Sequence, residues 1–124
     1  MPTEKSKLGK EGEDFACNYL RRKKWKIIGR NIKIHADEID VIARAPDKTL
    51  VFVEVKTMIG YYPDGLRPEN QMTNAKLIKL RRSASLYAGH NQKTISEERG
   101  WRLDVVALTK IGNDFLVNHY ENVG

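Results

Sequence analysis

The chain has 124 residues and a mass of 14.2 kDa, a length that fits a single domain covering residues 1–124. Hydrophobic residues make up 40% and charged residues 31% of the sequence, which favours a folded globular protein over a disordered one. No apolar stretch approaches the roughly 18 residues of a membrane span, and the first seven residues lack the apolar segment of a signal peptide. We therefore expect a cytoplasmic protein that has no membrane partner.

The formal net charge of +6 favours partners that are rich in phosphate. Basic residues gather in two clusters. One spans residues 21–26 and includes Arg21 and Arg22, and the other includes Lys76, Lys79 and Arg82. Each cluster is consistent with a nucleic-acid-binding surface and equally with a solvated helix face, and charge alone does not distinguish the two.

The first half of the chain predicts a helix followed by strands. Apolar residues recur at helical spacing over residues 8–24, and basic residues crowd the last turn, where they complement the helix dipole. Cys17, the only cysteine, falls among these apolar positions and is expected to be buried. Strands are predicted over residues 25–34, with a bulge at Gly29, and over residues 38–45.

A third strand over residues 49–56 completes an antiparallel hairpin with the second. Residues 57–72, rich in glycine and proline, predict a long surface loop. A second helix over residues 73–88 is expected to stop at Gly89, and two more strands follow near the C-terminus. A helix between the third and fourth strands favours a parallel pair in a mixed sheet. The pattern predicts an α/β fold with a five-stranded mixed sheet and flanking helices.

The strand over residues 50–56 ends in an acid and a base. Side chains alternate across a strand, so Glu54 and Lys56 share one face with Leu50 and Phe52, and the three valines between them fill the other face. Burying a carboxylate and an ammonium on an apolar strand is costly unless the two are paired or one holds a metal. This strand end is therefore a candidate active site.

The length of the hairpin turn decides which residue lies opposite Glu54. A three-residue turn pairs Ala45 with Thr49 and Asp40 with Glu54, whereas a turn of two or four residues places Ile39 there. Like charges directly opposite each other destabilise a sheet. A divalent cation between them would reverse that penalty, because Mg²⁺ binds one or two carboxylates.

In this interpretation Asp40, Glu54 and the main-chain carbonyl of Val55 hold Mg²⁺, which polarises a phosphodiester and activates water. Lys56 orients that water or neutralises the charge that develops on phosphorus. Glu38 shares a face with Asp40 and is either a second acid behind the metal ligands or a solvated strand end. The alternative is an acid that simply forms an ion pair with Lys56 at the margin of the sheet.

Five motifs together resemble the YraN-type family of small uncharacterised bacterial proteins. They are Gly9-Lys10-Glu11-Gly12-Glu13, Glu38-Ile39-Asp40, Phe52-Val53-Glu54-Val55-Lys56, Lys76, and Arg102-Leu103-Asp104-Val105-Val106. That family is similar to the PD-(D/E)xK nucleases of restriction-endonuclease-like fold, and to archaeal Holliday-junction resolvases in particular. The resemblance implies that fold, a Mg²⁺ or Mn²⁺ cofactor, and DNA as partner, including branched DNA. Junction-cleaving relatives act as symmetric dimers, so it also implies a homodimer.

The resemblance assigns roles residue by residue. Asp40 and Glu54 match the metal ligands, Lys56 matches the catalytic lysine, and Glu13 matches a helix glutamate that contributes to the site. Without the resemblance, Glu13 is a surface acid near the start of a helix. The chain departs from the family pattern at Asp37, where glycine is usual, and at Met58, where arginine is usual.

Further charged residues carry weaker signals. Arg102 and Asp104 share a strand face, which favours a structural ion pair or a buttress for the first helix. The three histidines, including His119, have no ligand spacing among them and are interpreted as incidental.

Three functions remain open at this point. The first is a Mg²⁺-dependent endonuclease that hydrolyses DNA, with branched or structured DNA as one substrate class. The second is a nucleic-acid-binding module that keeps the fold without the activity. The third is an interaction or scaffold protein in which Glu54 and Lys56 form only a salt bridge.

Overall fold

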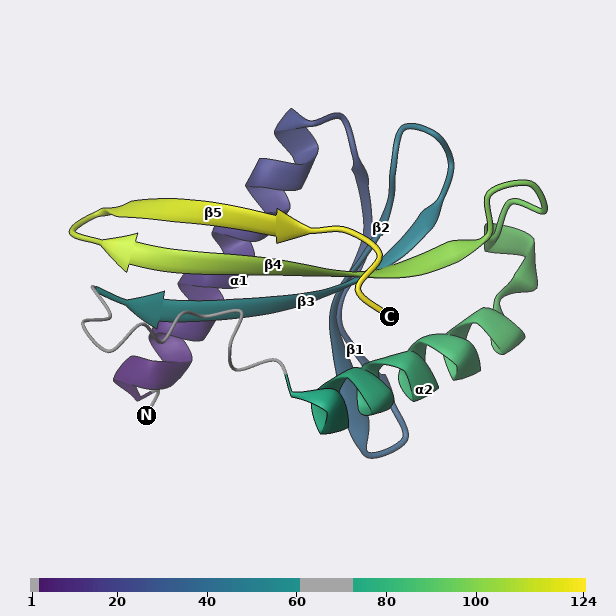
Figure 1. The fold of residues 1–124 in the computed structure, drawn as a ribbon, viewed down its shortest axis with the longest axis horizontal. Helices are drawn as coiled ribbons and strands as arrows, with labels where there is room; N and C mark the ends of the chain where they lie inside the picture. Colours follow the sequence, from purple (N-terminus) through teal and green to yellow (C-terminus); the bar gives the residue numbers. More distant parts are fainter. Residues whose placement is uncertain (1–2, 61–72) are drawn as a thin grey trace.

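The computed structural model describes residues 3–60 and 73–124 (Figure 1). Their elements follow the order that the sequence predicts: helix, three strands, helix and two strands. The elements are α1 (Glu4–Arg22), β1 (Lys26–Ile34), β2 (Asp37–Arg44), β3 (Leu50–Ile59), α2 (Asn74–His90), the short 3-10 helix η2 (Gln92–Thr94), β4 (Trp101–Ile111) and β5 (Asp114–Tyr120).

The described strands form a five-stranded sheet in the order β1-β2-β3-β4-β5. β3 and β4 run parallel, and the other neighbours are antiparallel. The predicted mixed sheet is thus confirmed. α2 lies in the crossover between β3 and β4, as a parallel pair requires. The register between β1 and β2 shifts between Ile27 and Gly29, which confirms the bulge at Gly29.

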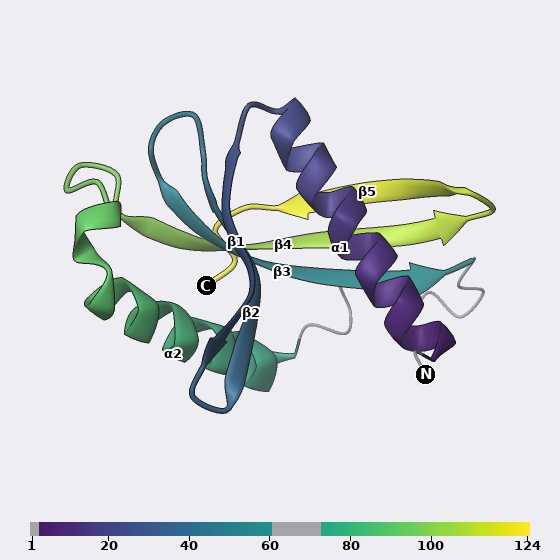
Figure 2. The ribbon, with the colours of Figure 1, turned by 180° about the vertical axis from the view of Figure 1, so that it is seen from behind.

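The two described α-helices cover opposite faces of the sheet (Figures 1 and 2). α1 packs on a buried cluster that includes Leu20, Val51 and Val53. α2 packs on a second cluster through Leu80 and Ala84. The odd-numbered positions of β3 therefore face α1 and the even-numbered positions face α2, which is the alternation that the sequence predicts.

The ends of α2 and β3 differ in detail from the prediction. α2 continues through Gly89 to His90, because Asn91 caps it by donating from its side chain to the Tyr87 carbonyl at 2.9 Å. β3 continues to Ile59, paired with β4, so residues 57–59 of the predicted loop are strand. The remainder of that loop, residues 61–72, lies outside the described residues.

The β2–β3 hairpin has the three-residue turn that the register argument favours. Ala45 donates its amide to the Thr49 carbonyl at 2.9 Å, and the ladder runs from Arg44↔Leu50 to Val41↔Val53. The next step in this register is Asp40 opposite Glu54, and there the two strands separate. Past this point, residues 37–39 of β2 pair with β1 alone, and residues 55–59 of β3 pair with β4 alone. We call the separation at Asp40 and Glu54 the fork.

Neither described α-helix is long and apolar enough to cross a membrane.

Candidate active site at the fork between β2 and β3

Asp40 occupies the branch point of the fork. The Val55 amide donates to Asp40 Oδ2 at 2.8 Å, taking up a hydrogen-bonding group of β3 that β2 no longer pairs. Burial and the negative charge of Glu54 raise the pKa of Asp40 to about 8, with a smaller contribution from Glu13, while the Val55 amide and Lys56 oppose the rise. The fork thus holds an acid whose ionised form is poorly stabilised by the protein.

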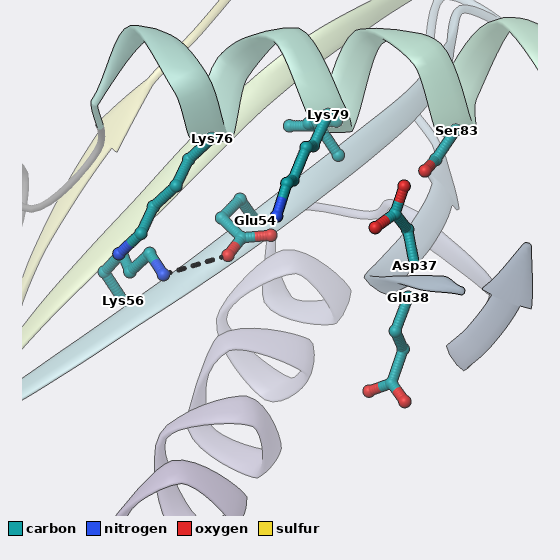
Figure 3. A pocket seen from close by; sticks show the side chains of 8 residues that line it. Asp37, Glu38, Glu54, Lys56, Lys76, Lys79 and Ser83 are labelled. Carbon is teal, nitrogen blue, oxygen red and sulfur yellow. Dashed lines mark ion pairs between the residues drawn. The ribbon is translucent and has the colours of Figure 1, made fainter.

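Glu54 and Lys56 project together toward α2 (Figure 3). Lys56 Nζ lies 3.1 Å from Glu54 Oε1, and each side chain is 18% exposed. This exposure leaves the ion pair open to solvent on one side, so a ligand can reach both groups. The even-numbered face of β3 is therefore apolar at Leu50 and Phe52 and charged at Glu54 and Lys56.

A hollow of about 180 Å³ lies between the fork and α2, and we call it the α2 hollow. Figure 3 shows Lys76 and Lys79 reaching from α2 toward Lys56 and Glu54. The lining of the α2 hollow combines acids from β2 and β3 with lysines from β3 and α2. The lining residues are Asp37, Glu38, Glu54, Lys56, Lys76, Lys79, Leu80 and Ser83. The predicted site residues Glu54, Lys56, Lys76 and Lys79 thus share one hollow, and Asp40 lies beside it at the branch point.

Glu13 comes to the fork from the opposite side, on α1. The helix lies so close to β3 at this level that a side chain at Gly12 would collide with Thr57. Burial raises the pKa of Glu13, the nearby Asn31 and Arg30 oppose this, and Glu38 reinforces it. Arg30 Nη2 stands 3.7 Å from Glu13 Oε1. The structure therefore places the helix glutamate within the electrostatic reach of Asp40.

The donor set at the fork suits a hard divalent cation. Asp40 and Glu54 supply carboxylate oxygens. Because the N–H and C=O of one strand residue point to the same side, the carbonyl of Val55 faces the fork together with its amide. Oxygen donors of these kinds are the ligands of Mg²⁺. A cation here would also offset the repulsion that raises the pKa of Asp40, so the residues fit the expected metal.

Of the predicted nucleic-acid contacts, Arg21 and Arg22 lie away from the fork, and Arg82 already forms an ion pair. Arg21 and Arg22 stand in the last turn of α1, with Arg21 about 12 Å along the helix from Glu13. Arg82 Nη2 lies 2.8 Å from Asp37 Oδ2, and this hydrogen bond is the main reason that the pKa of Asp37 is lowered. Arg82 thus ties α2 to the start of β2.

A second acidic cluster lies at the junction of α1, β4 and β5. Asp104 is fully buried and accepts from Arg102 Nε at 3.0 Å, from His119 Nε2 at 2.8 Å and from the Asn122 amide at 2.9 Å. Burial would raise the pKa of Asp104, but these hydrogen bonds lower it below its usual value. The predicted structural ion pair of Arg102 with Asp104 is confirmed.

His119 corrects the interpretation that the histidines are incidental. Its other ring nitrogen contacts Tyr19 Oη at 3.2 Å and Lys23 Nζ at 3.3 Å, so it joins β5 to α1. Asp104, His119 and Glu121 have ligand atoms within 4.8 Å of one another. Arg102, however, already pairs with both carboxylates. We therefore assign the cluster a structural role.

Comparison with known proteins identifies the family. The model of the uncharacterised protein family UPF0102 matches residues 12–108, from the glycine before Glu13 to β4. The chain belongs to this family. Relatives named UPF0102 protein include one from Kosmotoga olearia, which is 37% identical over 118 residues, 95% of this chain and 93% of the relative. One from Syntrophotalea carbinolica is 34% identical over 120 residues, 97% of this chain and 93% of the relative.

The family match confirms the YraN-type resemblance and covers each residue of the fork. Sequence reasoning missed three neighbours of the site: Asp37 and Ser83, which line the α2 hollow, and Arg30, which approaches Glu13. Asp37 had a signal, because it departs from the family's usual glycine. Arg30 had none, since its contact joins strand and helix residues 17 positions apart.

Proposed function

We propose that the chain is a divalent-metal-dependent endonuclease that hydrolyses DNA phosphodiester bonds at the fork. The observation that supports this most strongly is the meeting of Asp40, Glu54 and Lys56 beside a hollow that Lys76 and Lys79 also line. The resemblance of the same motifs to those of PD-(D/E)xK nucleases of restriction-endonuclease-like fold, and of archaeal Holliday-junction resolvases, is consistent with this proposal. DNA, including branched DNA, is the substrate class that we propose.

In this proposal Asp40, Glu54 and the Val55 carbonyl hold Mg²⁺ or Mn²⁺. When bound, the cation polarises the phosphodiester and lowers the pKa of a water molecule. Asp40 must lose its proton to act as a ligand, and its raised pKa keeps that proton in place until positive charge arrives. Glu13, which lies near Arg30, would accept a proton from water at the edge of the metal site.

The lysines would neutralise the negative charge of the phosphate groups. Lys56 would exchange its present partner Glu54 for the non-bridging oxygens of the reacting phosphate, where negative charge grows in the transition state. Lys76 and Lys79, on the first turns of α2, would bind phosphates of the same strand. One chain has one fork among its described residues, so cutting both strands of a junction would require a dimer, and a monomer would nick.

A second candidate function is a nucleic-acid-binding module without catalysis. The ion pair of Glu54 with Lys56 favours it, because this contact satisfies both charges without a metal. The lysines of the α2 hollow would still bind phosphate, and binding would weaken steeply with salt.

Cleavage assays separate the two functions. The purified chain is incubated with linear duplex, single-stranded and four-way-junction DNA, with Mg²⁺, with Mn²⁺ and with EDTA. Glu54→Gln and Lys56→Met test the fork, and Glu97→Gln, at an exposed position, controls for loss of an acid.

The nuclease proposal expects cleavage that requires the metal, that falls by about 10²-fold or more in both fork variants and that persists in Glu97→Gln. Cleavage that survives Glu54→Gln would show that the fork is not the active site. Binding without cleavage under every metal condition would favour the binding module.

A further inference from the structure

A second hollow lies on the α1 side of Glu13, and we call it the α1 hollow. It has a volume of about 570 Å³, larger than the 180 Å³ or so of the α2 hollow. The first half of α1 and the middle of β1 supply its lining: Ser6, Gly9, Lys10, Glu13, Arg30 and Asn31. Three residues of the motif at positions 9–13, namely Gly9, Lys10 and Glu13, therefore line this hollow.

The two hollows flank one acidic centre. Glu13 lines the α1 hollow from the face of the sheet that α1 covers, whereas Glu54 and Lys56 line the α2 hollow on the opposite face. Glu38 lines the α2 hollow, and its charge also reaches Glu13. In Figure 3, Glu38 points away from α2, whereas Asp37 points toward it. The order across the molecule is thus α2 hollow, acids, α1 hollow.

Each hollow is lined by a lysine that forms no ion pair with an acid of the described residues. Around the fork, Lys56 pairs with Glu54, Arg30 with Asp14 at 2.7 Å, and Lys110 with Glu11. Within the described residues, the side chains of Lys10 and Lys79 form neither a hydrogen bond nor an ion pair. The cations that remain available to a ligand therefore stand on both sides of the acidic centre.

The other polar groups of the α1 hollow suit a phosphate rather than a cation. Glu13 lines the hollow beside Arg30, whose buried Nε has no hydrogen-bond partner among the described residues. Asn31 has a left-handed backbone, with φ of 51°, and its side chain hydrogen-bonds Glu13, which offsets part of the charge of that acid. At Gly9 a Cβ atom would meet nothing within 4 Å, so the wall next to Lys10 is open to solvent.

We propose that the α1 hollow is a phosphate-binding subsite, with Lys10 as its cation, for a nucleic-acid strand that crosses the fork. This inference rests on the proposed function and extends it. A polyanion passing over Glu13, Asp40 and Glu54 needs positive charge on both sides, because flanking phosphates position the strand while the reacting one sits at the centre. Lys79 supplies that charge on one side and Lys10 on the other.

The test compares three substitutions that each remove one positive charge: Lys10→Gln, Lys79→Gln and Lys93→Gln. Lys93 is exposed in η2, away from both hollows, and serves as the control. Binding of fluorescein-labelled single-stranded DNA is measured in EDTA over a range of salt concentrations, so that no cleavage interferes. Glutamine is a good helix former, which limits any effect of Lys10→Gln on the folding of α1.

The subsite predicts that Lys10→Gln weakens binding by about fivefold at low salt and reduces the slope of log K against log salt by about 0.7. Where the native chain cleaves, Lys10→Gln should raise KM and leave kcat nearly unchanged. Lys93→Gln should match the native chain in each measurement.

Two contrary outcomes have different meanings. If Lys79→Gln weakens binding but Lys10→Gln matches Lys93→Gln, the subsite is refuted and the proposed function stands. If the native chain binds no DNA at any salt concentration, the proposed function itself fails, and the subsite fails with it.

Discussion

Asp40 is half-buried and Asp104 is fully buried in the same sheet, and their surroundings are opposite. Asp104 receives hydrogen bonds from a guanidinium, an imidazole and a main-chain amide, and its pKa is lowered. Among the described residues, Asp40 receives one hydrogen bond, from the Val55 amide, and burial beside Glu54 raises its pKa to about 8. The first arrangement stabilises the fold, whereas the second stores repulsion that a cation would relieve.

The two local sequence patterns are nearly mirror images. Glu54 and Lys56 are an acid and a base two residues apart on β3, and Arg102 and Asp104 are a base and an acid two residues apart on the neighbouring β4. Spacing therefore does not separate a structural pair from a candidate active site. What separates them is the set of partners that the fold brings from other elements.

The largest predicted effect is on the stability of the Asp104 cluster. Asp104→Asn leaves Arg102 and His119 without their carboxylate, and breaking a buried charged network costs about 3–5 kcal/mol. We expect Tm to fall by more than about 10 °C at pH 7, measured by calorimetry. A loss below about 1 kcal/mol would mean that the cluster does not hold β4, β5 and α1 together.

The corresponding substitution Asp40→Asn should have the opposite effect on the free energy of unfolding and stabilise the chain. The folded-state pKa of about 8 lies above the ordinary 3.8, so the protonated acid contributes stability that is complete below pH 4 and is lost as pH rises through 8. Asp40→Asn removes this loss. In EDTA it should stabilise the chain by about 2 kcal/mol at pH 8 and change little at pH 4, measured by urea unfolding. Destabilisation at pH 8 would contradict the assigned repulsion.

A pair of glycines tests whether α1 must lie against β3 to bring Glu13 to the fork. Gly12→Ala should clash with Thr57 and cost about 1–2 kcal/mol, even after the gain in helix propensity. Gly9→Ala meets nothing within 4 Å and should stabilise the chain by up to about 1 kcal/mol. Equal effects of the two substitutions on the urea midpoint would refute the close contact.

The smallest effect is the stabilisation of the native chain by metal. A ligand that binds only the folded chain raises stability by about 2.7 kcal/mol at 100 times its Kd, and by less near its Kd. With 5 mM Mg²⁺ at pH 8 we expect a Tm increase of a few degrees for the native chain and for Asp37→Asn, but none for Glu54→Gln. An equal increase in all three proteins would place the metal outside the fork.

Local sequence patterns predicted most of the fold. The helical spacing before Leu20, the alternation along β3 and the three-residue turn after Ala45 each depend on neighbouring residues, and the structure confirms all three. The place where the β2–β3 ladder stops could not be predicted, because it depends on how far β2 follows β1 and β3 follows β4.

Contacts distant in sequence were also beyond prediction. His119 meets Tyr19 across 100 positions, and Arg82 meets Asp37 across 45. Neither contact has a local pattern, so the sequence alone predicts an incidental His119 and a nucleic-acid contact at Arg82. The roles of Asp40, Glu54 and Lys56 stay predictions, although the fold places these residues together as the register argument requires.

Calorimetric titration of the chain with Mn²⁺ at pH 7, in two buffers of different ionisation enthalpy, tests the fork most directly. We expect one ion to bind per chain with the release of about one proton, because Asp40 is mostly protonated below its pKa of about 8 and must ionise to bind. Asp40→Asn and Glu54→Gln should abolish both signals. No binding by the native chain, or binding that survives in both variants, would contradict a metal centre at Asp40 and Glu54.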